Sequence, residues 1–401
     1  IIYTHAENKL KNYVESAGRL KEKPLSYSTV EKTFYSFFIS PDLLQTSLDD
    51  NNDPRDLERI QILQLMNVIA DEIFIDKFSF IGYTSLGFFT LSFIFLFTKD
   101  FIIQFISIFS NLVDTEQPID NSKRDFIKKS ISLGIIGISG TATGFGFYNS
   151  RKGPSVIKYD IFLESLPESF NNFTIAQISD LHVGPTIKRP YVENVLDKIS
   201  ILNPDLIAVT GDLVDGSVQH LRPELAPLKD MIAPFGTYFV TGNHEYYSGV
   251  DLWLDETDRL GMKNLINSNE LISRSGDQIA IAGITDLKAH QIKPAHKSDP
   301  GLALRSVPDN ITKIVLAHQP NSIHSVHEIG ADLQLSGHTH GGQFWPFTYL
   351  TKLANPYIAG FYDHYGTQIY VNRGTGYWGP PLRIGVPAEI TLIRLKKKEV
   401  L

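Results

Sequence analysis

The sequence contains no cysteine, so the chain can form neither a disulfide nor a thiolate metal site. Any metal ion must therefore be bound by histidine, aspartate, asparagine or glutamate side chains. The sequence also lacks an excess of basic residues, because 37 Lys and Arg are set against 44 Asp and Glu and the formal net charge is -7. This balance gives no polybasic footprint, and we expect no nucleic-acid partner.

Charges are missing altogether from one long stretch near the N-terminus. Residues 78–97 are rich in Phe, Ile and Leu and are flanked by Lys77 and Lys99. Their number matches the roughly 20 residues that cross ~30 Å of hydrocarbon. A second candidate span, richer in Gly, Ser and Thr, covers residues 130–149. The apolar run 101–113 is too short to span, and we expect it to form an interfacial or re-entrant segment.

Basic residues between the two candidate spans indicate a topology. The segment from Lys99 to Lys129 carries most of them and is expected to be cytoplasmic, which places the chain after residue 150 outside the cytoplasm. Residues 122–129 resemble a degenerate twin-arginine export signal with Lys123 in place of the first arginine. The alternative is that these are ordinary positive-inside charges, and both interpretations give the same topology. Basic residues just after residue 150 oppose it.

The composition and periodicity of the sequence divide the chain into three regions. Residues 1–76 have no assigned role, although 57–75 show apolar side chains at helical spacing and predict a packing helix. Residues 77–150 form the membrane-associated region. From residue 155 to 397, short β-rich runs alternate with helical patterns, which predicts a layered α/β domain.

We predict nine strands and four helices in this domain. The strands lie near 156–162, 173–179, 206–210, 236–241, 279–283, 311–317, 333–336, 369–372 and 388–395. The helical patterns lie near 189–201, 220–232, 250–260 and 321–329.

Ligand-type side chains follow five of the predicted strands. They are Asp180 and His182 after 173–179, Asp212 and Asp215 after 206–210, Asn243 and His244 after 236–241, His318 after 311–317, and His338 and His340 after 333–336. Ligands in layered α/β domains bind at the carboxyl ends of strands. We therefore expect these side chains to meet in one site.

The spacing of these residues suits metal binding. His338 and His340 stand two apart among glycines, and in an extended segment side chains at i and i+2 point the same way. Asp180 and His182 repeat this spacing. The carboxylate of Asp212 can bridge two ions. Oxygen and nitrogen ligands suit Mn, Fe or Zn better than a calcium cage, and two such ions can activate water and clamp the oxygens of a phosphoryl displacement.

In chain order the motifs are Asp180-x-His182, Gly211-Asp212-x-x-Asp215, Gly242-Asn243-His244-Glu245, His318 and Gly337-His338-x-His340. This order resembles that of the calcineurin-like metallophosphoesterase superfamily, and the resemblance extends over residues 156–397. It implies a four-layer α/β fold in which two packed β-sheets are flanked by helices, here preceded by an N-terminal membrane-associated region.

The resemblance also implies a role for each matching residue. The first of two divalent metal ions would be held by Asp180, His182, Asp212 and His340. The second would be held by Asp212, Asn243, His318 and His338. His244 would be the general acid or a donor to the transition state, and Asp215 would orient it. Gly216 stands where phosphoprotein phosphatases carry arginine, which argues against that activity.

The C-terminal stretches, such as Asn372-Arg373-Gly374, resemble bacterial membrane-anchored or exported members of the superfamily. Some relatives of this group cleave the pyrophosphate of a UDP-linked diacylglucosamine. Arg373 and Arg383 are candidates for phosphate binding, with a structural role as the alternative. The apolar segment 344–350 is interpreted either as a wall that receives a lipid or leans on the bilayer, or as a loop that packs on the sheets.

We therefore expect a membrane-anchored, extracytoplasmic metallophosphoesterase. It would hydrolyse a phosphomonoester, phosphodiester or pyrophosphate bond, in a lipid-linked or sugar-nucleotide substrate, by attack of metal-activated water. Two alternatives remain open at this point. One is a catalytically silent membrane-tethered sensor or scaffold, and the other is a phosphohydrolase of soluble nucleotides.

Overall fold

The computed structural model describes residues 72–110 and 121–398. The chain divides into two compact units, Ile1–Ser79 and Phe80–Leu401, and the fold considered below belongs to the second. Most of the predicted N-terminal region lies outside the described residues. So does the predicted helix at 57–75, except for its last four residues, which begin helix α5.

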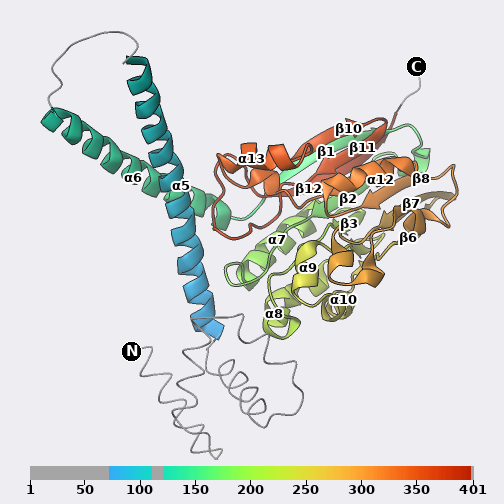
Figure 1. Cartoon of the computed structure of the whole chain (residues 1–401). Helices are drawn as coiled ribbons and strands as arrows, with labels where there is room; N and C mark the ends of the chain where they lie inside the picture. Colours follow the sequence, from blue (N-terminus) through green and yellow to red (C-terminus); the bar gives the residue numbers. More distant parts are fainter. Residues whose placement is uncertain (1–71, 111–120, 399–401) are drawn as a thin grey trace, which may run out of the picture. The chain divides into compact units, whose positions relative to one another are not determined.

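Two long helices come first in the described chain (Figure 1). Helix α5 runs from Glu72 to Ser110 and α6 from Asn121 to Arg151. By length and composition both can cross a membrane, with mean hydropathies of 1.8 and 1.3. The expectation of a separate interfacial segment at 101–113 is wrong within the described residues, because α5 continues unbroken to Ser110. No proline or glycine interrupts residues 99–110, so nothing in the sequence ends the helix there.

The two helices pack antiparallel and meet the rest of the second unit at one edge. The rings of Phe80 and Phe147 lie 5.7 Å apart, and Lys99 donates to the hydroxyl of Ser132 over 3.0 Å. Residues of both helices then contact a loop near the C-terminus. The Ser150 hydroxyl donates to the carbonyl of Pro381 over 2.8 Å. Helices and loop are thereby joined by hydrogen bonds as well as by apolar contacts.

The remainder is built on two six-stranded sheets. The first has the order β1-β12-β2-β3-β4-β5, with strands Ser155–Leu163, Glu389–Lys397, Thr174–Ile178, Leu206–Val209, Thr237–Phe239 and Lys263–Asn264. The second has the order β10-β11-β9-β8-β7-β6, with strands Gly360–His364, Thr367–Val371, Leu333–Ser336, Thr312–Leu316, Asp277–Gly283 and Ser268–Arg274. Strands β2 to β5 are mutually parallel, as are β7, β8, β9 and β11, so their carboxyl ends share one edge.

Further α-helices connect the strands. They are α7 (Arg189–Leu202), α8 (Val218–Leu225), α9 (Asn243–Tyr247), α10 (Val250–Arg259), α11 (Pro300–Leu304), α12 (Ile323–Glu328) and α13 (Phe347–Ala354). Each of the nine predicted strands is present, and the predicted four-layer α/β class is confirmed. The additional elements are the strands β5, β6 and β10 and the short helices α9, α11 and α13. They are short or carry mixed polar side chains, so their periodicity is weak.

The core is layered because successive strand residues point to opposite faces. In β3, Leu206 and Ala208 face the second sheet, where they join a cluster that includes Ile281 and Leu335. Ile207 and Val209 instead join the cluster beneath α7, α8 and α10. Every residue of β3 is buried, and the strand reads as a continuous apolar run.

Truncating Ile281 at the centre of this sandwich should lower the stability of the domain. Ile281→Ala leaves a cavity between fully buried neighbours and is expected to cost ~2–5 kcal/mol. The measurement is the thermal midpoint of unfolding, which should fall by roughly 5–15 °C. Ile232→Ala is the matched control, since Ile232 is 80% exposed and its loss should shift the midpoint by about a degree. Equal shifts in the two variants would contradict the assignment of this core.

Candidate active site

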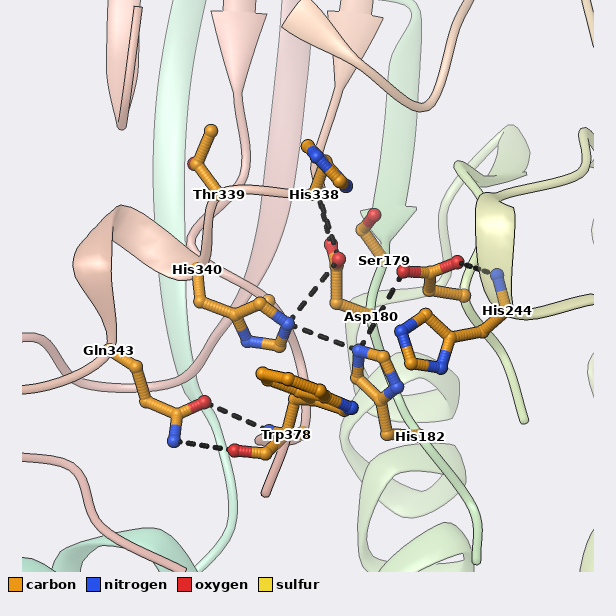
Figure 2. Close-up of polar contacts among 12 residues, drawn as sticks. Ser179, Asp180, His182, His244, His338, Thr339, His340, Gln343 and Trp378 are labelled. Carbon is orange, nitrogen blue, oxygen red and sulfur yellow. Dashed lines mark hydrogen bonds and ion pairs between the residues drawn. The ribbon is translucent and has the colours of Figure 1, made fainter. Parts of the chain in front are cut away.

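The predicted ligand residues converge at the shared edge of the two sheets (Figure 2). Asp180 and His182 follow β2, Asp212 and Asp215 follow β3, Asn243 and His244 open α9 after β4, His318 follows β8, and His338 and His340 follow β9. Because all five of these strands run parallel to one another within their own sheet, their loops leave the sheets together.

The loops themselves adopt an uncommon backbone conformation. Asp180, His182, Asp212, His338 and His340 all have φ between 50° and 71°, in the left-handed region that non-glycine residues seldom occupy. Such conformations cost on the order of 1–3 kcal/mol each and gather at functional sites. The expectation of an extended segment at the two C-terminal histidines is therefore wrong. Tight turns, rather than strand alternation, aim these side chains.

The turns separate the imidazoles into two groups. In the first, ligand atoms of Asp180, His182 and His340 lie within 4.8 Å of one another. The Nε2 atoms of His182 and His340 are 3.1 Å apart, and Nε2 of His340 is 3.5 Å from Asp180. Ring nitrogens that face each other this closely, deep in the protein, have the arrangement that a shared cation requires.

The second group consists of Asp212, His318 and His338, again within 4.8 Å. The Nε2 atom of His318 lies 3.0 Å from Oδ2 of Asp212 and 3.1 Å from Nδ1 of His338. Asp212 also approaches the first group, because its Oδ2 is 3.9 Å from Nε2 of His182. The Asp212 carboxylate thus stands between the two groups.

Asn243 provides an independent sign that a ligand belongs here. Its side-chain oxygen Oδ1 is buried and has no hydrogen-bond partner among the described residues. Leaving a buried acceptor unsatisfied costs about 1–3 kcal/mol. A divalent cation would satisfy this atom, so the donor set and the orphaned oxygen both fit the metals that the sequence predicts.

His244 and Asp215 form a pair beside the first group. The Nδ1 atom of His244 is 2.5 Å from Oδ1 of Asp215, and the same oxygen is 3.0 Å from Nδ1 of His182. One carboxylate therefore orients two imidazoles. His244 remains partly exposed and lies against the rings of Tyr247 and Trp378 at 5.4 and 5.9 Å.

The electrostatics of the site favour cations. Burial alone lowers the pKa of His182, but the carboxylates of Asp215 and Asp212 outweigh it and raise this pKa to about 9. Burial acts in the same way on the pKa of His318, which Asp212 raises well above its ordinary value. By contrast, burial and the neighbouring His318 lower the pKa of His338 to about 3. Carboxylates that draw protons onto buried imidazoles also attract metal ions.

Glu245 holds the Asp212 loop through backbone hydrogen bonds. Its carboxylate accepts hydrogen bonds from the backbone N–H groups of Gly242, Asp212 and Leu213, at 2.7 to 3.0 Å. The side chain is buried, and burial followed by the Asp212 charge raises its pKa to about 7. The only signal in the sequence is a carboxylate directly after the Asn243-His244 pair.

The comparisons agree with this geometry. A family model for calcineurin-like phosphoesterases matches residues 173–342. The transmembrane protein with metallophosphoesterase domain of Danio rerio is 34% identical over 330 residues, which cover 80% of this chain and 74% of that protein. This chain belongs to the calcineurin-like metallophosphoesterase family.

Two further proteins are similar to this metallophosphoesterase. An uncharacterized metallophosphoesterase of Helicobacter pylori is 36% identical over 279 residues, covering 69% of this chain and 72% of that protein. A solved structure of a putative 5'-nucleotidase from Staphylococcus aureus in complex with alpha-ketoglutarate is 14% identical, with a TM-score of 0.37 over 57% of this chain and 55% of that chain. The family identifies the protein as a phosphoester hydrolase with buried His and Asp groups that can bind metal.

The two predicted phosphate-binding arginines of the metallophosphoesterase differ in their surroundings. Arg383 is only 1% exposed. It donates hydrogen bonds to the backbone carbonyls of four loop residues, which are His340, Arg373, Gly374 and Gly376. Its two terminal nitrogens are therefore used by the protein, which fits the structural alternative rather than phosphate binding. Arg373 is one-third exposed and lies 3.3 Å from Glu389, so it alone keeps donors facing solvent.

The apolar segment 344–350 is divided between two environments. Phe344 is buried with Leu91 of α5 and Leu382. Trp345 is 44% exposed, and its ring lies 5.8 Å from that of Phe95 in α5. The segment therefore contacts helix α5, and the alternative of a loop that packs on the sheets is wrong.

Trp378 is a residue of the site that the sequence analysis missed. The amide side chain of Gln343 fixes its backbone through two hydrogen bonds of 2.8 Å, one to the N–H and one to the carbonyl (Figure 2). The indole is thereby held beside His244 and is half exposed. The signal that could have found it is a tryptophan in a Gly- and Pro-rich loop.

Replacing Arg383 should weaken metal binding, although Arg383 itself does not contact the substrate. In Arg383→Met, several buried carbonyls and Nδ1 of His340 lose their donor, and the loop that aims His340 loosens. The expected result is a roughly 10–100-fold loss of Mn²⁺ affinity, measured by isothermal titration calorimetry. The control is Arg394→Met, which removes a surface ion pair with Asp160 and should leave affinity unchanged. Unchanged affinity in both variants would refute this role of Arg383.

Proposed function

We propose that the chain is a dinuclear metal-dependent phosphoesterase whose metal ligands are those that the sequence motifs mark. One ion would take Asp180, His182, Asp212 and His340, and the other would take Asp212, Asn243, His318 and His338. The observation that carries the proposal is the position of Asp212 between two groups of ligand atoms. The orphaned oxygen of Asn243 supports the same assignment.

The chain's own residues then account for the remaining parts of the reaction. Two divalent ions bound here would supply an activated water and neutralise charge on the phosphoryl oxygens. His244 is partly exposed at the edge of the site and would give a proton to the leaving oxygen. Asp215 fixes the ring of His244 through Nδ1, which leaves Nε2 to face the substrate.

The mouth of the site suggests the kind of molecule it admits. Arg373 keeps part of its guanidinium exposed and suits a second phosphate or another anionic group. Tyr247 and Trp378 flank His244 with exposed rings, so they suit a bulky apolar or aromatic group next to the phosphate. This combination supports a lipid-linked or sugar-nucleotide substrate rather than a small phosphate ester.

Membrane anchoring is part of the proposal. It is supported by two helices that are long and apolar enough to span, and by a relative whose name describes a transmembrane protein. The Lys and Arg side chains between Lys99 and Lys129 support a cytoplasmic loop there and a catalytic domain on the opposite side, since this rule counts basic residues and not net charge.

Protease treatment of intact spheroplasts tests this orientation. If the domain is extracytoplasmic, added protease should degrade residues 151–401 while a cytoplasmic marker protein stays intact. Full protection of the domain, with degradation only after lysis, would reverse the topology.

Two substitutions separate metal binding from proton transfer. Asp212→Ala removes the carboxylate shared by both ions and should lose both, as measured by plasma mass spectrometry of the purified protein. His244→Ala should keep both metals and lose about 10²–10⁴-fold in Mn²⁺-stimulated hydrolysis of bis-(p-nitrophenyl) phosphate.

His290→Ala serves as the matched control, because this histidine is exposed and lies outside the site. It should keep both metal content and turnover. Loss of metal from His244→Ala would show that this histidine is a ligand, and full activity of Asp212→Ala would contradict the dinuclear proposal as a whole.

A further inference from the structure

Helix α13 is an amphipathic helix without a buried side chain. Tyr349, Leu350 and Leu353 are 65%, 57% and 85% exposed, and the helix contains no acidic residue. Its one charged side chain, Lys352, is exposed and long enough to reach the polar zone while its stem stays in an apolar layer. A soluble protein seldom leaves such a surface uncovered.

The place where the catalytic region meets α5 indicates what covers this surface. Leu91 and Phe95 pack with Phe344, Leu382 and Phe347, the first residue of α13. Both lie inside the charge-free stretch of α5. Leu91 lies about 12 Å of helix rise from Lys99 at one end of that stretch and about 20 Å from Phe78 at the other.

This depth has a direct consequence. The headgroup zone on each side of the hydrocarbon is only about 5–8 Å thick. If the charge-free stretch of α5 enters a bilayer, the protein edge that contacts Leu91 and Phe95 enters it too. The exposed face of α13 and the half-exposed ring of Trp345 then lie where apolar and aromatic side chains are stable.

The edge that would enter the bilayer also carries the metal site. The turn of His340 continues directly into this edge, and Gly342 packs so tightly on α13 that an added Cβ would lie 2.4 Å from the Cα of Thr348. Any displacement of α13 would therefore act on a metal ligand two residues from that glycine.

We propose that α13, together with Trp345, lies in the interfacial layer of a phospholipid bilayer and holds the mouth of the metal site at the membrane surface. This inference rests on the membrane anchoring proposed above and not on the phosphoesterase chemistry. Lipid is the proposed partner of the exposed face of α13, and a second copy of the chain is the alternative partner.

The absence of cysteine makes the test direct, because single labels can be placed on the full chain. Leu353→Cys and Tyr365→Cys are each labelled with the fluorophore NBD and reconstituted into phosphatidylcholine vesicles. Both positions are 85% exposed, but Tyr365 lies in the turn between β10 and β11, at the amino end of β11 and therefore at the edge of the sheet opposite to the site. Leu350→Cys repeats the first position one turn earlier, should the first variant fail to fold.

Phosphatidylcholine with a shallow doxyl spin label is then added to the vesicles. Quenching at position 353 should exceed quenching at 365 several-fold, with a blue-shifted emission at 353 only. Equal quenching at the two positions would overturn the proposal. Energy transfer between copies labelled at 353, without quenching by the spin-labelled lipid, would assign the face to a second copy and overturn it as well.

Hydrolysis of soluble bis-(p-nitrophenyl) phosphate by the same samples separates this inference from the proposed function. Activity without quenching at 353 would overturn only the placement of α13. Quenching in a folded, metal-loaded but inactive protein would overturn only the proposed function.

Discussion

The site depends on the contacts that the carboxylate of Asp212 makes with two imidazoles. This carboxylate lies 3.0 Å from one imidazole and 3.9 Å from another, and each belongs to a different group of ligands. Burying so much charge is expensive unless it is compensated. Here carboxylates and imidazoles compensate each other in part, and bound cations would compensate the remaining negative charge. The fold can keep this cluster only because two rigid sheets hold its parts in place.

Close backbone approach is the second requirement, and glycine meets it at the same turns. A Cβ at Gly242 would lie 2.1 Å from Oδ1 of Asp212, and one at Gly337 would lie 1.9 Å from the hydroxyl of Ser179. Any other residue would push apart the loops that bring the ligands together. The glycines beside the metal-binding motifs are thus explained by space, and the carboxylate of Glu245 closes the arrangement through three backbone N–H groups.

The strands and the convergence of their ends were predictable from the sequence. Each strand that leads to the site is a short, buried apolar run, and the Asp, Asn or His residues of the site follow it directly. The same approach failed where the answer depended on a partner far along the chain. Arg383 resembles a phosphate ligand in sequence, but its donors meet the carbonyls of a loop that only the fold brings near. For the segment 344–350, which includes the first half of α13, the sequence left two alternatives open, because its apolar residues could equally have packed on the sheets. For the region 101–110, length alone suggested a break that the helix does not make.

One oxygen atom of Asp215 contacts both His182, a predicted metal ligand, and His244, the predicted proton donor. The two imidazoles therefore compete for the same negative charge. By thermodynamic reciprocity, whatever withdraws electron density from the first ring must alter the proton affinity of the second, and the reverse holds equally. Metal binding at His182 and proton affinity at His244 would in this way be coupled through one side chain, Asp215.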